Sequence, residues 1–357
     1  MIRARLKRAV RTALLSPAGS PLASVYRGVA TCLMYHRVAA GTRADAHARG
    51  KFQPNLELFV AEEELDAQMR WLAREYDCVA LPEAVELLQR GKLPKRTAVV
   101  TFDDGYRDNL LALPILRHHR VPVTIYVTTG AVGRTRTMWW DEQERILGCL
   151  SKLELEWRGG RLAWALETQE QKAAAFNDLN RLFKSLPPPG QDELIELLRA
   201  RAHDSGSDEP FFTDESILSW EDVQTLDAEP LITIGAHTVD HFVLSQLPAG
   251  ELERQLRESR RVLEERLGRP VLHFAYPFGG EEHAGGREFA AAAAAGFLSA
   301  VTTRPNHWRS ASRQALHALP RLAIDFSDTM DDFRWKVSGL ASAVHRPRSL
   351  FDAAPRE

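Results

Sequence analysis

Short apolar runs rich in β-forming residues recur along this chain, and helical patterns separate most of them. The helical stretch at residues 251–268 ends in Gly268, two residues before Pro270, which is a helix stop signal. Strands that alternate with helices form a parallel sheet, and seven strands suit a closed or nearly closed barrel. We therefore predict an α/β fold. The runs lie at residues 30–34, 98–102, 123–127, 231–234, 271–275, 298–302 and 319–324.

One segment departs from this alternation. Residues 153–167 alternate apolar and polar side chains on both sides of Arg158-Gly159-Gly160, which predicts a β-hairpin. Two helical patterns follow, and Ser219 to Asp222 resembles a capping box at the start of the next helix. We interpret residues 141–218 as an insertion into one barrel domain. The predicted divisions are a basic N-terminal helix or tail at 1–28, the barrel at 29–335 and a C-terminal tail at 336–357.

Charge and cysteine content exclude several classes of protein. The formal net charge is −2, so no overall field favours nucleic acid. The three cysteines, Cys32, Cys78 and Cys149, lack C-x-x-C spacing, which argues against a thiolate metal site and against a disulfide framework. No apolar run approaches the roughly 18 residues of a membrane span, and the N-terminus lacks the apolar core of a secretory signal. These features predict a cytoplasmic location.

The N-terminus nevertheless has a feature that suits a membrane surface. Ile2, Leu6, Val10 and Leu14 are spaced four apart, and basic residues lie among them. Such a helix can lie on an anionic bilayer face. Two interpretations stay open: a solvated or partly disordered terminal helix, and peripheral contact with the inner membrane face through this helix.

Ionisable residues follow two of the predicted strands. Asp103 and Asp104 come directly after residues 98–102, and neighbouring side chains at a strand end point in different directions. His237 and His241 follow residues 231–234, with a spacing that places two imidazoles on one side of a helical turn. Alone, the first motif also fits an ordinary turn, and the second also fits two surface or core histidines. Together, at the rim where barrel active sites lie, one aspartate and two histidines make a catalytic metal site with an open position for water.

A third strand end carries a rigid loop. Residues 271–275 lead into Tyr276-Pro277-Phe278-Gly279-Gly280. Backbone N–H groups in such a loop can stabilise an oxyanion, although an ordinary strand-to-loop turn has the same composition.

The motifs TFDDG, HTVDH and YPFG, in this order, resemble those of the polysaccharide deacetylase family (the NodB-homology domain, carbohydrate esterase family 4). The resemblance runs from about residue 30 to about residue 330, with the insertion outside it. It implies a distorted (β/α)7 barrel that hydrolyses an N-acetyl group of a sugar. It also implies a divalent metal, with zinc as the first choice and cobalt, nickel or manganese as alternatives.

The resemblance also implies roles for individual residues. Asp103 matches the catalytic base of the family, and the backbone N–H of Phe278 matches its oxyanion donor. The metal ligands match Asp104, His237 and His241.

The third motif departs from the family pattern. Many members have Arg-x-Pro-Tyr there, and this chain has Ala275 in place of the arginine that braces the base. Arg321 and Arg107 are the candidates to replace that support.

The family also needs a histidine as general acid, usually in a late Leu-x-His motif. His317 follows the third motif but fits that position poorly. Members associated with exopolysaccharide synthesis carry this histidine in the first strand, as Leu33-Met34-Tyr35-His36 does here. We therefore assign the acid to His36 and keep His317 as the alternative. Strand alternation assigns Tyr35 to packing.

These assignments predict a hydrolase that deacetylates an amino sugar of a bacterial surface polysaccharide or of its lipid-linked precursor. Trp139, Trp140 and Tyr276 are the predicted substrate contacts; the alternative for the tryptophans is core packing under the insertion. Deformylation of a lipid-linked amino sugar would use the same residues. A rival of another class is a catalytically weak glycan-binding barrel that acts as a scaffold in a polysaccharide-synthesis complex.

Overall fold

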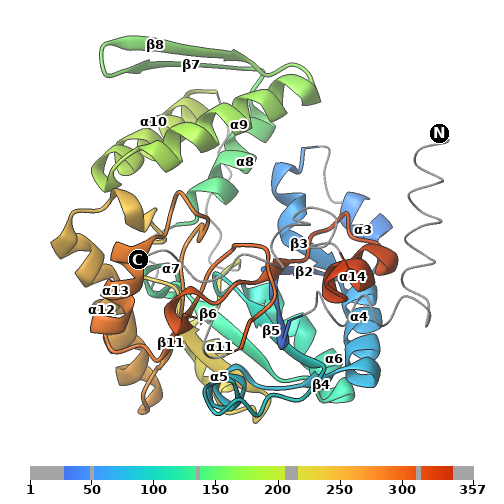
Figure 1. Ribbon diagram of the computed structural model, residues 1–357. Coiled ribbons are helices and arrows are strands. Elements are labelled where there is room, and N and C mark those ends of the chain that lie inside the picture. Colours follow the sequence, from blue (N-terminus) through green and yellow to red (C-terminus); the bar gives the residue numbers. More distant parts are fainter. Residues whose placement is uncertain (1–27, 49–51, 134–136, 206–215, 311–314, 341–357) are drawn as a thin grey trace.

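The structure is a computed structural model that describes residues 28–48, 52–133, 137–205, 216–310 and 315–340 (Figure 1). The predicted basic N-terminal helix lies outside the described residues, as does most of the predicted C-terminal tail. Among the described helices, none combines the length and the apolar character that crossing a membrane requires.

A curved parallel sheet forms the centre of the molecule, with the strand order β11-β10-β9-β6-β5-β1-β12 and β4 paired with β5. Each of the seven predicted apolar runs overlaps one of these strands, and the two-residue β4 was not predicted. The strands are β1 Ala30–Tyr35, β4 Asp77–Cys78, β5 Thr97–Phe102, β6 Val123–Val127, β9 Ile232–Ala236, β10 His273–Ala275, β11 Ser299–Val301 and β12 Leu322–Ala323.

The two edges of this sheet approach each other through one segment. Leu319 pairs with Val301 of β11 in a parallel bridge, and five residues later the Ile324 N–H donates to Met34 O of β1 at 3.0 Å. The sheet is therefore bent into a nearly closed, distorted barrel, which confirms the predicted fold. Strands β1, β5 and β6 consist of buried residues, as expected for parallel strands that are covered on both faces.

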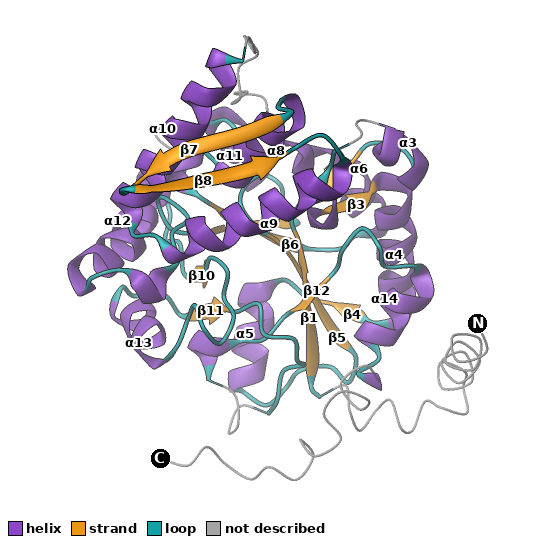
Figure 2. Ribbon diagram, turned by 90° about the horizontal axis from the view of Figure 1, so that it is seen from above, coloured by secondary structure: helices purple, strands orange, loops and turns teal. Residues whose placement is uncertain are grey.

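Helices surround the sheet (Figures 1 and 2). The predicted stop signal after α12 is confirmed, because Gly268 adopts a left-handed φ of 67° and its N–H donates to Glu264 O. The α-helices are α3 Arg43–Ala48, α4 Glu62–Glu75, α5 Leu81–Gln89, α6 Ala112–His119, α7 Thr129–Val132, α8 Trp139–Cys149, α9 Gln169–Ser185, α10 Pro188–Asp204, α11 Trp220–Asp227, α12 Ala249–Leu267, α13 Gly286–Ala294 and α14 Met330–Val337. The short elements are η2 Pro54–Leu58, η3 Arg107–Leu111, η4 Leu244–Gln246, η6 Leu316–Ala318, β2 Arg37–Ala39 and β3 Phe59–Ala61.

The segment between α8 and α11 forms a layer above the barrel (Figure 1). Strands β7 Lys152–Trp157 and β8 Gly160–Ala165 pair antiparallel around Arg158 and Gly159, which both have positive φ, so the predicted hairpin is confirmed. Lys172 of α9 donates to three carbonyl oxygens at the end of α8, between 2.6 and 2.9 Å. The predicted capping box at Ser219 is also present, at the start of α11.

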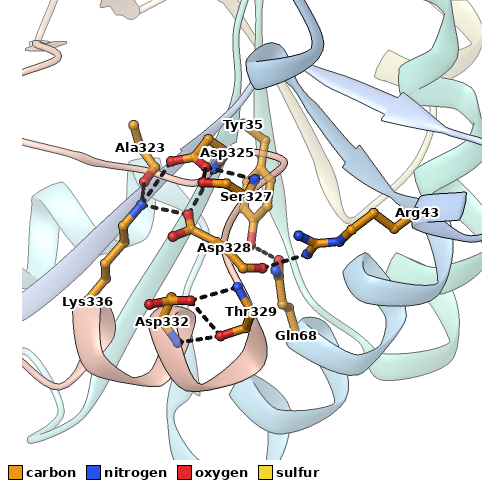
Figure 3. A network of polar contacts seen from close by, with 10 residues as sticks. All are labelled: Tyr35, Arg43, Gln68, Ala323, Asp325, Ser327, Asp328, Thr329, Asp332 and Lys336. Atoms are coloured by element: carbon orange, nitrogen blue, oxygen red, sulfur yellow. Dashed lines mark hydrogen bonds and ion pairs between the residues drawn. The ribbon is translucent and has the colours of Figure 1, made fainter. Parts of the chain in front are cut away.

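A polar network anchors α14 beside the last strand (Figure 3). The Lys336 ammonium donates to Ala323 O at 3.0 Å and pairs with Asp325 at 3.2 Å and with Asp328 at 2.6 Å. On the neighbouring wall, the Tyr35 hydroxyl donates to Gln68 Oε1 and its ring stacks on Phe102, so Tyr35 is a packing residue, as predicted. Lys336 therefore joins α14 to the strand that completes the barrel.

We predict that Lys336→Met lowers the free energy of unfolding by about 1–3 kcal/mol, because a buried carboxylate, Asp328, loses its cation. Urea denaturation measures this change. Arg70→Met is the control, since Arg70 is an exposed partner of Asp66 on one helix and its loss should leave stability nearly unchanged. Equal effects of the two substitutions would contradict the anchoring role of Lys336.

Candidate active site

One carboxylate and two imidazoles meet at the carboxyl ends of the strands. Asp104 follows β5, and His237 and His241 follow β9; both strands pair with β6, so they lie two strand positions apart. Asp104 Oδ1 lies 3.2 Å from His237 Nε2 and 3.1 Å from His241 Nε2. All three residues are buried, and their ligand atoms lie within 4.8 Å of one another.

The chemistry of these atoms fits a divalent cation. His237 Nδ1 lies 2.8 Å from Ala275 O. Because a carbonyl oxygen only accepts, Nδ1 carries the proton and the lone pair of Nε2 faces Asp104. Asp104 Oδ1 has no aligned hydrogen bond despite the short distances. Two imidazole nitrogens and a carboxylate oxygen that converge without aligned hydrogen bonds match the donor set of zinc.

The turn that carries the histidines is not helical, so the predicted helical turn is wrong. Thr238 and His241 adopt left-handed φ angles of 66° and 55°. The Thr238 hydroxyl accepts from the His241 N–H at 3.0 Å, and Gln255 Oε1 accepts from the N–H groups of Val239 and Asp240. These side-chain acceptors replace helical hydrogen bonds and turn both imidazoles toward Asp104.

Asp103 lies beside this cluster in a buried ion pair with Arg321. The Arg321 Nη1 and Nη2 atoms each lie 2.6 Å from one carboxylate oxygen of Asp103. The arginine also donates to Thr302 O and to Thr101 Oγ1. Burial alone would raise the pKa of Asp103, but the charge and hydrogen bonds of Arg321 hold that pKa below its ordinary value.

Of the two candidate arginines, Arg321 is therefore the one that contacts Asp103. Arg107 lies elsewhere: its guanidinium is half exposed and pairs with Asp222 at 3.3 Å. The structure thus gives Arg107 no contact with Asp103 among the described residues.

His36 borders the same cavity as Asp103, Asp104, His237 and His241. It follows β1, in which Tyr35 is in register with Phe102 of β5, so His36 and Asp103 are the first residues beyond two neighbouring strands. The alternative, His317, is on η6 and bonds to Phe297 O at 2.8 Å; it is not among the residues that line this cavity.

Trp139 and Trp140 pack in the core under the insertion and also border the cavity, and substrate contact by either remains a prediction. Each is buried, yet each lines the cavity. Trp139 stacks on Phe183 of α9 with ring centroids 4.5 Å apart, and Trp140 packs edge-on against His241 at 4.7 Å. Phe278 also lines the cavity and has a left-handed φ of 58°.

The structure does not support the prediction that Tyr276 contacts substrate. Tyr276 is fully buried between Phe274 and Phe289, and its hydroxyl donates to His317 O at 3.0 Å. Its side chain leaves the strand end on the face away from the cavity, which the sequence could not distinguish from the opposite face.

Arg37, which follows His36, packs against residues beside the cavity. Its guanidinium lies over the rings of Phe59 and Tyr106, at 4.4 and 4.3 Å, and pairs with Asp108 and Asp141. The Tyr106 hydroxyl donates to Asp141 and accepts from the Trp140 indole N–H at 2.8 Å. Arg37 thereby connects the end of β1 to the start of α8, where the tryptophans lie.

Several residues of the cavity wall could not be identified from the sequence, because they carry no local motif. The buried residues along α9 predict a helix, but they do not show which part of the protein that helix covers. Asn55, Glu57 and Leu58 come from η2, Asn180 and Lys184 from α9, and Thr303 from the segment after β11.

The chain is similar to known deacetylases. A family model described as polysaccharide deacetylase matches residues 90–152 and 165–296, which is more than half of the chain; the interruption falls in the β7–β8 hairpin. The poly-β-1,6-N-acetyl-D-glucosamine N-deacetylases of two Staphylococcus aureus strains, MRSA252 and MSSA476, are 27% and 29% identical over 132 and 130 residues, 35% of this chain in both cases. The chain covers 42% and 40% of the length of these curated relatives.

Solved structures share the fold. The deacetylase PplD of Streptococcus pyogenes has a TM-score of 0.54 at 17% identity, covering 86% of this chain and 97% of that one. IcaB from Ammonifex degensii has a TM-score of 0.53 at 20% identity, covering 88% and 97%.

Removing one ligand should abolish tight zinc binding. We predict that Asp104→Asn weakens zinc affinity by more than about 100-fold, while Asp103→Asn keeps one zinc per chain, because only Asp104 belongs to the converging cluster. Competition with a chromophoric chelator and elemental analysis give the affinity and the stoichiometry. Full zinc occupancy in Asp104→Asn would reject its ligand role.

Removing the buried cation should destabilise the fold in a pH-dependent way. We predict that Arg321→Met lowers the free energy of unfolding at pH 7 by about 3–5 kcal/mol, because Asp103 is left buried and unpaired. Arg107→Met, with its half-exposed guanidinium, should cost no more than about 1 kcal/mol.

The sign of the pH effect follows from Asp103. Its pKa is lowered in the folded protein, so the pair stabilises the fold above the unfolded value of ~3.9 and this contribution is lost as pH falls through the folded value. Denaturation at pH 7 and at successively lower pH should therefore show the difference between wild type and Arg321→Met shrinking. A difference that grows on acidification would contradict the pairing.

Proposed function

The chain belongs to the polysaccharide deacetylase family, and on that basis we propose that it hydrolyses the N-acetyl group of an amino sugar in a bacterial surface polysaccharide or its precursor, with the help of a divalent metal. The observation that carries this proposal is the convergence of Asp104, His237 and His241 beside the Asp103–Arg321 pair in one cavity.

Amide hydrolysis requires activated water, a stabilised tetrahedral oxyanion and a protonated leaving nitrogen. Asp104, His237 and His241 would hold zinc, or cobalt, nickel or manganese in its place, and a divalent ion there supplies Lewis-acid chemistry and lowers the pKa of water. The remaining tasks fall to groups of the chain itself.

Asp103 is proposed to take the proton of the attacking water. Its lowered pKa keeps the carboxylate ionised near neutral pH, and the two hydrogen bonds from Arg321 fix its orientation. The backbone N–H of Phe278, in the strained loop after β10, is proposed to donate to the oxyanion, an interaction worth about 3 kcal/mol at comparable sites.

His36 is proposed to protonate the departing nitrogen. An imidazole can donate a proton and regain it near neutral pH, and His36 lines the cavity from the strand next to that of Asp103. The two side chains therefore act on the bound amide from neighbouring strand ends, one as base and one as acid.

The curated relatives indicate which glycan to test first. They are named for poly-β-1,6-N-acetyl-D-glucosamine, so we propose an N-acetylglucosamine polymer as the first substrate and a lipid-linked N-acetylhexosamine as the second. Release of formate instead of acetate from a lipid-linked amino sugar would assign the deformylase alternative.

We predict that Asp103→Asn and His36→Ala each lower kcat by about 100-fold or more, because each removes a proton-transfer group. Acetate release from zinc-loaded protein and β-1,6-linked N-acetylglucosamine oligomers measures the rate, and zinc analysis checks that the metal is retained. His118→Ala, an exposed histidine on α6, is the control and should keep wild-type activity.

Two results would contradict these assignments. Full activity of His36→Ala would remove His36 from the reaction. Zinc-loaded wild type that binds the oligomers and the lipid-linked sugars but cleaves neither would replace the hydrolase with a glycan-binding scaffold.

A further inference from the structure

Helix α9 reaches the cavity from outside the barrel. It lies between the β7–β8 hairpin and the strand ends (Figures 1 and 2). Phe183 stacks on Trp139, and Gln246 Nε2 of η4 donates to Lys184 O at 2.5 Å. These contacts hold the last turn of α9 over the rim, with Asn180 and Lys184 as part of the cavity wall.

Lys184 has an unusual position for a lysine. Its Nζ lies 4.9 Å from the centre of the Phe278 ring. Burial lowers its pKa, which the charge of Glu57 partly opposes. Within the described part of the chain, the Lys184 ammonium makes no hydrogen bond or ion pair, whereas Lys172 on the same helix donates to three carbonyl oxygens. Lys184 therefore lines the cavity with an ammonium that has no hydrogen-bond acceptor among the described residues.

Glu57 supplies the complementary group. It comes from η2, far from α9 in sequence, and lines the same cavity, with its charge acting on Lys184. The Asp104–His237–His241 cluster and Asp103 also line this cavity, from the strand ends. A sugar ring needs donors and acceptors for its hydroxyl groups, and this wall offers the Lys184 ammonium, the Asn180 amide and the Glu57 carboxylate.

We infer that Lys184 and Asn180 of α9, together with Glu57 of η2, bind the hydroxyl groups of the sugar whose acetamido group faces the Asp104–His237–His241 cluster. This inference rests on the proposed function. It makes the segment between α8 and α11 part of the substrate site. Lys184 contributes to binding the ground state and the transition state equally, so it controls KM and not kcat.

The test compares Lys184→Met with wild type on β-1,6-linked N-acetylglucosamine oligomers. The expected result is a KM raised about tenfold or more, from the loss of a charged hydrogen bond, with kcat within about threefold. Zinc content should not change and thermal stability should change little, because the Lys184 ammonium contacts the Phe278 ring but makes no hydrogen bond or ion pair among the described residues. Arg181→Met is the matched control, since Arg181 lies on the same helix with an exposed guanidinium paired to Asp178.

Unchanged KM in Lys184→Met would overturn the inference, and so would a fall in kcat at constant KM. If Lys184→Met loses stability, Lys184→Arg provides the second variant: it keeps the charge and should retain a KM closer to wild type than Lys184→Met does. A Lys184→Arg KM no better than that of Lys184→Met, in folded protein, would also count against the inference.

A binding measurement separates this inference from the proposed reaction. Calorimetry of the same oligomers with Asp103→Asn should give an affinity that falls about tenfold when Lys184→Met is added. If wild type releases no acetate but binds in this Lys184-dependent way, the proposed reaction fails and the inference stands. Equal affinities of the two variants, or no binding by either, overturn the inference.

Discussion

The buried ion pair between Arg321 and Asp103 joins the parts of the barrel that hold the site. Arg321 lies in the segment that bonds to β11 through Leu319 and to β1 through β12, and Asp103 is the first residue after β5. Removing two charges from water costs several kcal/mol per ion, and two aligned hydrogen bonds, with further bonds to Thr101 and Thr302, offset that cost. The same contacts that close the curved sheet therefore fix the orientation of Asp103 relative to Asp104.

Backbone strain is concentrated around this pair. Among the described residues other than glycine, six have a positive φ, and four of them surround the site: Asp104, Thr238, His241 and Phe278. A left-handed conformation costs such a residue about 1–3 kcal/mol and persists only where the surrounding structure imposes it. Here the barrel imposes it at three strand ends, and the result is that one carboxylate and two imidazoles converge within 4.8 Å. The rigid sheet thus sustains a local geometry that a free loop would not adopt.

The sequence predicted the barrel because its parallel strands are buried on both faces and appear as continuous apolar runs. It also predicted the hairpin, since Arg158 and Gly159 supply the positive φ angles of the turn. The helical turn for the two histidines was wrong, because a spacing of four does not reveal the side-chain acceptors of Thr238 and Gln255. The predicted substrate contact of Tyr276 was wrong, because the direction of a side chain just beyond a strand depends on what packs against it. Here that partner is Phe289 of α13. Lys184 was missed because only the tertiary fold brings α9 to the rim.

Asp104, His237 and His241 are proposed to hold one divalent ion together, beside Asp103. A crystal structure of the zinc-loaded protein, with diffraction data collected on both sides of the zinc absorption edge, tests this proposal most directly. The expected result is a single anomalous peak at about 2.0–2.2 Å from a carboxylate oxygen of Asp104 and from Nε2 of both histidines. An ion bound to other residues, or these three side chains in mutual contact with no ion between them, would contradict it.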